Sequence, residues 1–261
     1  MQLLRAAWFS RGFVRLLVVA LMVVGRLVAA GDPAQYADSI ARARAVLEKE
    51  MPKVPGATVA VAVEGQIVWS EAFGFSDLEA KRPAVTTTRF RIGSVSKPVT
   101  AAGLMLLVER GALDLDAPVQ KYVPDFPVKA EGRITTRLLG GHLAGIRHYQ
   151  GTETGLNKPF ANVRAGLSIF ENDPLVAPPG TKFFYTTYGW SLISAVMESA
   201  AGRDFLSYME AEVFKPLGMT HTRPDRAGAD DPDRTHFSAA VDDFAAHEGL
   251  AGGTGIVRRR H

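Results

Sequence analysis

Ser94 and Lys97 are the residues of this chain best suited to carry a reaction. Residues three apart share one face of a helix, so the Ser94 hydroxyl and the Lys97 amine can meet. Serine is a poor nucleophile at neutral pH, and a lysine whose amine is neutral can act as its base. The pair therefore predicts a serine nucleophile that forms an acyl-enzyme. The same tetrapeptide also occurs by chance, as a helix-capping serine followed by a solvated lysine.

An aromatic segment further along the chain adds two hydroxyl groups, those of Tyr185 and Thr187. A tyrosine oxygen near a lysine amine can relay protons between a nucleophile and a leaving group. The Thr187 hydroxyl can hydrogen-bond the substrate or Lys97. Aromatic residues packed into a core would give a similar sequence. The segment therefore supports a catalytic site only in combination with Ser94 and Lys97.

A third segment contains His142, His148 and Tyr149. Two histidines suggest a metal pair, but no carboxylate-rich stretch accompanies them. We therefore expect no metal and no cofactor. His142 is expected to be structural and to shape the loop behind the cleft. His148 and Tyr149 are expected to line the rim and contact the substrate.

A long apolar helix is predicted to carry the serine and the lysine, from Ser94 to Arg110, with Gly111 closing it. Because it is apolar almost all round, we expect it to be buried, with its N-terminus at a cleft. Such an N-terminus directs backbone N–H groups at a developing oxyanion.

The remaining elements follow from periodicity and turn residues. A β-hairpin is predicted with strands over 57–63 and 66–70 and a turn at 64–65. Residues 74–92 are expected to be mostly loop. Further helices are predicted over 35–50, 134–143, 161–171, 186–201 and 204–214.

The composition fits one large globular domain with a substantial core. The chain has 261 residues, of which 47% are hydrophobic and 22% charged. It contains no cysteine, which excludes disulfides, cysteine nucleophiles and thiolate metal sites.

Residues 1–30 have the pattern of a targeting segment, with arginines, an apolar run and small residues at its end. A cleaved signal peptide is the first interpretation and predicts an extracytoplasmic protein. An uncleaved membrane anchor and a mitochondrial presequence are the alternatives. The segment holds four arginines and no acid, so without it the formal charge changes from +3 to −1. The basic pI therefore gives no reason to expect nucleic acid as a partner, and a membrane is expected only if the segment is retained.

The order and spacing of four segments resemble the penicillin-recognising serine hydrolases, the superfamily of class C β-lactamases and D,D-peptidases. Within that superfamily, the chain is most similar to the serine β-lactamase-like proteins of mitochondria and bacteria. The segments are residues 91–97, 111–124, 141–149 and 184–190. Four ordered motifs at family spacing are far more specific than any one of them.

This resemblance implies that Ser94 is the acylated nucleophile, Lys97 its base and Tyr185 a proton relay. The family's Tyr-x-Asn element has Thr187 in place of its asparagine here. A threonine lacks the reach of the amide, which favours peptide or ester substrates over β-lactam antibiotics. The substrate is expected to be a small molecule or a peptide.

The resemblance also implies an α/β (α+β) fold of the β-lactamase/transpeptidase type, with a helical subdomain and an antiparallel sheet over residues 31–243. The family's third motif, a Lys- or His-led triplet ending in glycine on a strand beside the serine, is not found after residue 200. We therefore expect the C-terminal strands to be missing and residues 244–261 to form a divergent tail. The alternative function is a truncated, weak or inactive member that binds cell-wall peptides or partners.

Overall fold

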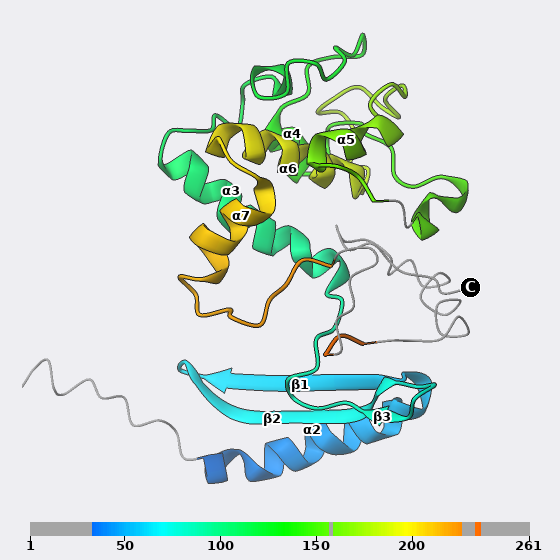
Figure 1. Ribbon diagram of the computed structural model, residues 1–261, viewed down its shortest axis with the longest axis vertical. Coiled ribbons are helices and arrows are strands. Elements are labelled where there is room, and N and C mark those ends of the chain that lie inside the picture. Colours follow the sequence, from blue (N-terminus) through cyan, green and yellow to red (C-terminus); the bar gives the residue numbers. More distant parts are fainter. Residues whose placement is uncertain (1–32, 157–158, 226–232, 236–261) are drawn as a thin grey trace, which may run out of the picture. The chain divides into compact units, whose positions relative to one another are not determined.

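The computed structural model describes residues 33–156, 159–225 and 233–235. The expected targeting segment, 1–30, and the expected tail, 244–261, lie outside the described residues. The chain divides into two compact units (Figure 1). Unit 1 runs to Phe75 and includes Ala84–Thr86, and unit 2 holds Ser76–Pro83 and the described residues from Thr87 onward.

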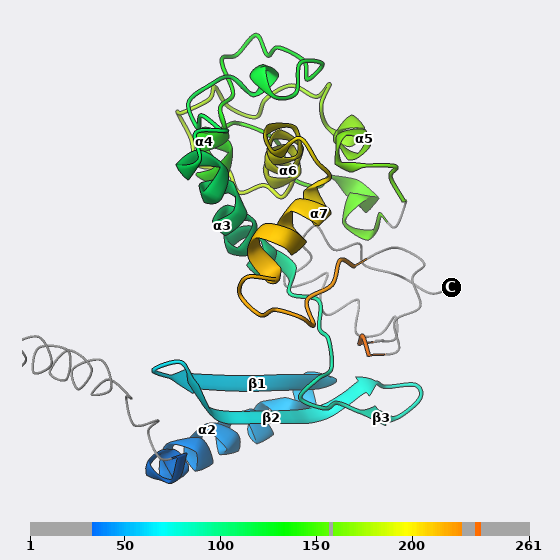
Figure 2. The same ribbon diagram turned by 60° about the vertical axis from the view of Figure 1, so that its left-hand side comes forward.

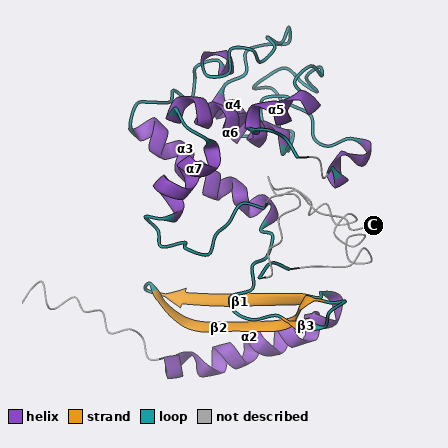
Figure 3. Cartoon of the chain, viewed as in Figure 1, coloured by secondary structure: helices purple, strands orange, loops and turns teal. Residues whose placement is uncertain are grey.

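Unit 1 is a helix laid along a β-hairpin (Figure 3). A short 3-10 turn, η1 (Pro33–Tyr36), leads into α2 (Ala37–Glu50), and η2 (Met51–Lys53) follows it. Strand β1 (Gly56–Val63) then pairs antiparallel with β2 (Gln66–Asp77). Both residues of the connecting turn, Glu64 and Gly65, have positive φ, as a two-residue hairpin turn requires. The predicted helix and hairpin are confirmed.

A buried tryptophan and an ion pair join the helix to the hairpin. Trp69 on β2 is 8% exposed, and its indole N–H donates to Glu71 at 2.8 Å. The Nε–H of Arg44 on α2 is shared between the two oxygens of the same carboxylate, at 2.9 and 3.0 Å. A two-residue strand, β3 (Arg82–Pro83), extends the sheet in the order β1-β2-β3, within the stretch that was predicted to be mostly loop.

Unit 2 is helical and is organised around α6 (Tyr188–Ala201), which lies in the middle of the other helices (Figure 2). Nine of its fourteen residues are buried. The helices packed against it are α3 (Ser96–Glu109), α4 (Thr136–Gly140), α5 (Val163–Gly166) and α7 (Phe205–Met209). Shorter turns complete the unit: η3 (Gly93–Val95), η4 (Val119–Lys121), η5 (Gly151–Gly155), η6 (Leu167–Ile169) and the π-helical turn η7 (Glu210–Phe214).

Three of the predicted helices are shorter than expected, slightly at their starts and more at their ends. Thr135, Asn162 and Asp204 are N-caps, and the side chain of each accepts a backbone N–H three residues on. The α-helical turns then give way to a left-handed residue at His142, to the 3-10 turn η6, and to the π turn η7.

The prediction that the helix after Ser94 is buried is confirmed for one of its faces only. Its buried positions lie on one face, where α6 and α7 pack against it, whereas Met105 is 50% exposed. Within the part of the chain that the structure describes, no helix is both long and apolar enough to cross a membrane.

Two glycines with left-handed backbones give a matched test of packing around the loop of residues 141–149. Gly145 has a φ of 73°, and a Cβ there would lie 2.1 Å from the carbonyl oxygen of Ala177. Gly111 has a φ of 69° and no atom within 4 Å of such a Cβ. Gly111→Ala is expected to cost about 1–2 kcal/mol, the conformational penalty alone.

Gly145→Ala adds overpacking of about 1–3 kcal/mol to that penalty. Urea denaturation followed by circular dichroism measures both variants. Equal losses of stability in the two variants would show that the backbone at Gly145 is not packed tightly against the carbonyl oxygen of Ala177.

Candidate active site

The turn that carries the serine brings Ser94 and Lys97 together. Ser94 lies in η3, and Lys97 is the second residue of α3. Lys97 Nζ donates to Ser94 Oγ at 3.1 Å, so the spacing argument is confirmed. Ser94 is exposed, whereas Lys97 is 7% exposed. The hydroxyl therefore faces incoming molecules while the amine is shielded.

Tyr185 completes the hydroxyl–amine cluster. Its phenolic oxygen lies 2.6 Å from Ser94 Oγ, and Lys97 Nζ lies 5.0 Å from the centre of its ring. Burial by itself would raise the pKa of the Tyr185 phenol, but hydrogen bonding with Lys97 and Ser94 outweighs it and the pKa is lowered. A phenol with a lowered pKa beside a hydroxyl is suited to move a proton.

Thr187 contacts the same lysine. Its Oγ1 accepts a hydrogen bond from Lys97 Nζ at 3.4 Å, and the residue is buried. Thr187 immediately precedes α6, so its position is tied to the central helix of unit 2. Of the two roles considered from the sequence, the structure displays the hydrogen bond with Lys97.

His148 and Tyr149 lie beside this cluster and are half-buried. The two rings stack with centres 4.4 Å apart, and the His148 ring meets the Tyr185 ring edge-on at 5.6 Å. Their contact with a substrate stays a prediction.

His142 approaches Tyr185 from a second direction, with ring centres 4.5 Å apart. Its Nδ1 accepts the backbone N–H of Thr186 at 3.1 Å, and His148 Nδ1 accepts that of Thr187 at 3.3 Å. Burial first, and the nearby Lys97 second, lower the pKa of both histidines below 6.5. Among the described residues, no group of three or more His, Cys, Asp or Glu side chains could hold a metal ion.

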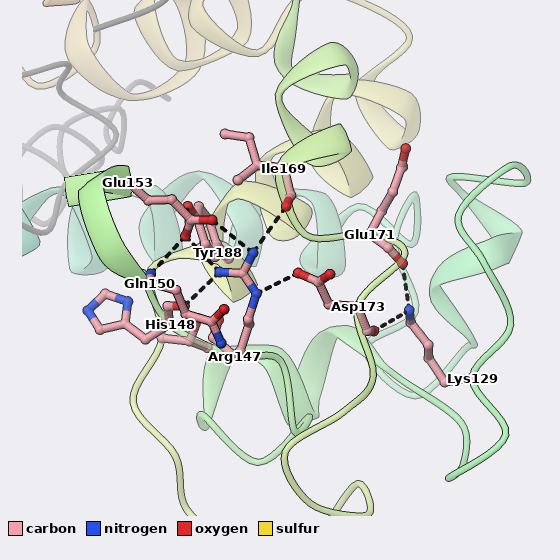
Figure 4. Close-up of polar contacts among 10 residues, drawn as sticks. Lys129, Arg147, His148, Gln150, Glu153, Ile169, Glu171, Asp173 and Tyr188 are labelled. Atoms are coloured by element: carbon pink, nitrogen blue, oxygen red, sulfur yellow. Dashed lines mark hydrogen bonds and ion pairs between the residues drawn. The ribbon is translucent and has the colours of Figure 1, made fainter. Parts of the chain in front are cut away.

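A buried arginine holds the loop that carries His148 and Tyr149 (Figure 4). Arg147 donates to Glu153 at 2.7 and 3.0 Å, to Asp173 and to the carbonyl oxygens of His148 and Ile169. Glu153 also accepts from the Tyr188 hydroxyl and the Gln150 backbone N–H, each at 2.8 Å.

This Arg147 network was not predicted. The carboxylates that pair with Arg147, those of Glu153 and Asp173, lie 6 and 26 residues from it along the chain, and no regular spacing connects them. The neighbouring Lys129 ammonium donates to the carbonyl oxygens of Glu171 and Asp173.

Comparison with known proteins identifies the family of this chain. A family model described as beta-lactamase matches residues 44–257. The chain belongs to the beta-lactamase family. The human mitochondrial serine beta-lactamase-like protein LACTB is 33% identical to it, over 72% of this chain and 47% of the human protein. The chain thus spans about half the length of the curated relatives it matches.

Two solved structures confirm the predicted fold. EstCE1, described as a hydrolase with promiscuous acyltransferase activity, is 29% identical, with a TM-score of 0.62 over 69% of this chain and 51% of its own. A class C beta-lactamase in complex with cefoxitin aligns with a TM-score of 0.64 over 78% of this chain and 55% of its own. At 21% identity the second match shows the fold alone.

The Arg147 network predicts a pH-dependent contribution to stability. Burial would raise the pKa of the Glu153 carboxyl, but the hydrogen bonds from Arg147, Gln150 and Tyr188 hold it below 4.5. Its contribution is therefore complete above pH 4.5 and is lost as the pH falls through the lowered pKa. At pH 7, Glu153→Gln is expected to cost about 2 kcal/mol, the magnitude of hydrogen bonds to a charged group.

The gap between wild type and Glu153→Gln should close as the pH falls below 4.5, which urea denaturation at several pH values measures. Asp116→Asn is the control, because Asp116 and Arg137 form an ion pair in which the side chains are 62% and 60% exposed. It should leave the denaturation midpoint unchanged. A pH-independent gap for Glu153→Gln would contradict the prediction.

Proposed function

We propose that this chain is a serine hydrolase that forms an acyl-enzyme through Ser94. The observation that carries the proposal is the meeting of three groups at hydrogen-bond distance or close to it: Ser94 Oγ, Lys97 Nζ and Tyr185 Oη. A nucleophile within reach of two proton-transfer groups is the arrangement that acyl transfer needs. Membership of the beta-lactamase family supports the same chemistry.

The proposed reaction has two steps. Ser94 Oγ attacks the carbonyl carbon of the substrate while its proton passes to the Lys97–Tyr185 pair. The bond to the leaving group then breaks, Tyr185 relays a proton to the departing atom, and an ester with Ser94 remains. Water attacks this ester in the second step, the same groups take its proton, and the Ser94 hydroxyl is restored. The N-terminus of α3 favours the negative charge that develops on the carbonyl oxygen.

We propose small esters or peptides as the substrate class. Thr187 supports this choice, because one hydroxyl replaces the amide that the family's Tyr-x-Asn element offers and this hydroxyl already faces Lys97. The description of EstCE1 as a hydrolase with acyltransferase activity is consistent with acyl transfer to and from the serine. We further propose that residues 1–30 direct the protein out of the cytoplasm.

A fluorophosphonate probe followed by intact-mass measurement tests the nucleophile. Wild type should gain one adduct, Ser94→Ala should gain none, and Ser96→Ala, a second serine in the same turn, should be labelled like wild type. Tyr185→Phe should be labelled about 10²–10⁴-fold more slowly, because a positioned acid–base group contributes on that scale. A folded wild-type chain without an adduct would overturn the proposal and favour the inactive, peptide-binding alternative.

Substitution of Thr187 tests the substrate assignment. Thr187→Ser keeps the hydroxyl and should retain hydrolysis of a p-nitrophenyl ester. Thr187→Val keeps the shape but removes the partner of Lys97, and should slow the reaction about tenfold, which corresponds to one hydrogen bond to a charged group. Turnover of nitrocefin faster than of the ester by wild type would contradict the preference.

A further inference from the structure

We propose that His142 and His148 are positioning residues, a pair of neutral acceptors that fix Tyr185 and Thr187 against Lys97. The inference rests on the proposed function, because it concerns the same hydroxyl groups. It assigns a positioning role to His142, which was expected only to shape a loop. It assigns the same role to His148, which was expected to contact the substrate.

The first step is the hydrogen bonding of two consecutive amides. The N–H groups of Thr186 and Thr187 donate to His142 Nδ1 and His148 Nδ1, at 3.1 and 3.3 Å. A ring nitrogen accepts a hydrogen bond only without a proton, so each imidazole is neutral with its proton on Nε2. Protonation of either ring would set an N–H against an N–H.

The second step concerns the hydrogen bonds between residues 184–187 and the histidine loop, residues 141–149, which carries both histidines. The Phe184 N–H donates to the His142 carbonyl oxygen at 2.8 Å, and the Thr186 hydroxyl donates to the Arg147 carbonyl oxygen at 2.6 Å. With the two imidazoles, this makes four hydrogen bonds over four residues. The Tyr185 side chain leaves the middle of this stretch, and its ring contacts both imidazoles.

The third step concerns the groups that surround the imidazole rings of His142 and His148. Lys97 and Tyr185 face both histidines, Tyr149 stacks on His148, and Phe183 and Trp190 contact the His142 ring. The imidazole of His148 points away from the Arg147 guanidinium, which Glu153 and Asp173 engage (Figure 4). Burial and the positive charge of Lys97 disfavour an imidazolium at both positions, and His148 adds to this effect at His142.

The histidines therefore stay neutral through the neutral pH range and protonate only below their ordinary value of 6.5. Because each pKa is lowered on folding, the contribution of each imidazole is complete above 6.5 and is lost as the pH falls through the lowered pKa. Acylation of Ser94 should show an acid limb in that range, when Thr186 and Thr187 lose their acceptors and Tyr185 is released.

Asparagine variants test this directly, because Asn Oδ1 takes the place of Nδ1 as an acceptor and does not titrate. His142 has a φ of 57°, a conformation that asparagine also tolerates. The double variant His142→Asn/His148→Asn should keep fluorophosphonate labelling at pH 7.5 within about tenfold of wild type and lack the acid limb. His148→Leu, which has no acceptor, should be labelled at least tenfold more slowly at every pH.

A second measurement does not depend on catalysis or on the folding of the histidine variants. In Ser94→Ala, nitrogen NMR of the histidines should show Nδ1 unprotonated at pH 7.5. The Thr186 and Thr187 amides should be protected from hydrogen exchange at that pH and lose protection as the rings protonate. Nδ1–H tautomers, or protection unchanged by ring protonation, would overturn the inference.

The two proposals fail separately in these experiments. Absence of labelling in wild type with the expected NMR result would defeat the acyl-enzyme and leave the histidine pair in place. Normal labelling with an acid limb that persists in the asparagine variants would defeat the histidine pair and leave the acyl-enzyme in place.

Discussion

The placement of the Lys97 amine is the constraint on which the rest of unit 2 depends. The amine of a lysine that is 7% exposed must find oxygen partners inside the protein, because an unpartnered buried amine is costly. Ser94 and Thr187 supply two of them, from the same turn and from the start of α6. The same amine contributes to the lowered pKa values of Tyr185 and both histidines. One side chain thus contributes to the protonation of its neighbours and hydrogen-bonds two of them.

Two supports hold the partners of Lys97 at the required distances. The first is α6, whose buried face packs on the surrounding helices and leaves the preceding Thr187 little freedom. The second is Arg147, which crosslinks the histidine loop to Glu153 and Asp173. Tyr188 connects the two supports, since it is the first residue of α6 and its hydroxyl donates to Glu153.

Sequence patterns predict the local parts of this site well and its long-range parts poorly. The Ser94–Lys97 contact follows from helical spacing alone, and the hairpin follows from a turn at Glu64 and Gly65. The Tyr185 contact required four motifs to be considered together, because nothing local brings residues 94 and 185 to one place. The partners of Arg147 and the left-handed conformation of His142 depend on tertiary packing, which no periodicity encodes.

The way Tyr185 is held has a consequence for how a substrate is selected. Its backbone neighbours are bonded to one loop, and the next residues enter the most buried helix of the unit. The phenol is therefore a stationary group, and a substrate must bring its leaving atom to it. Because Tyr185 is already in position, substrate binding need not supply energy to move it. In the proposed reaction, selection among substrates then depends on the surface around the serine. Val95 and Phe183, both more than half exposed, belong to that surface, so under the proposed function we expect acyl groups with an apolar side to be preferred.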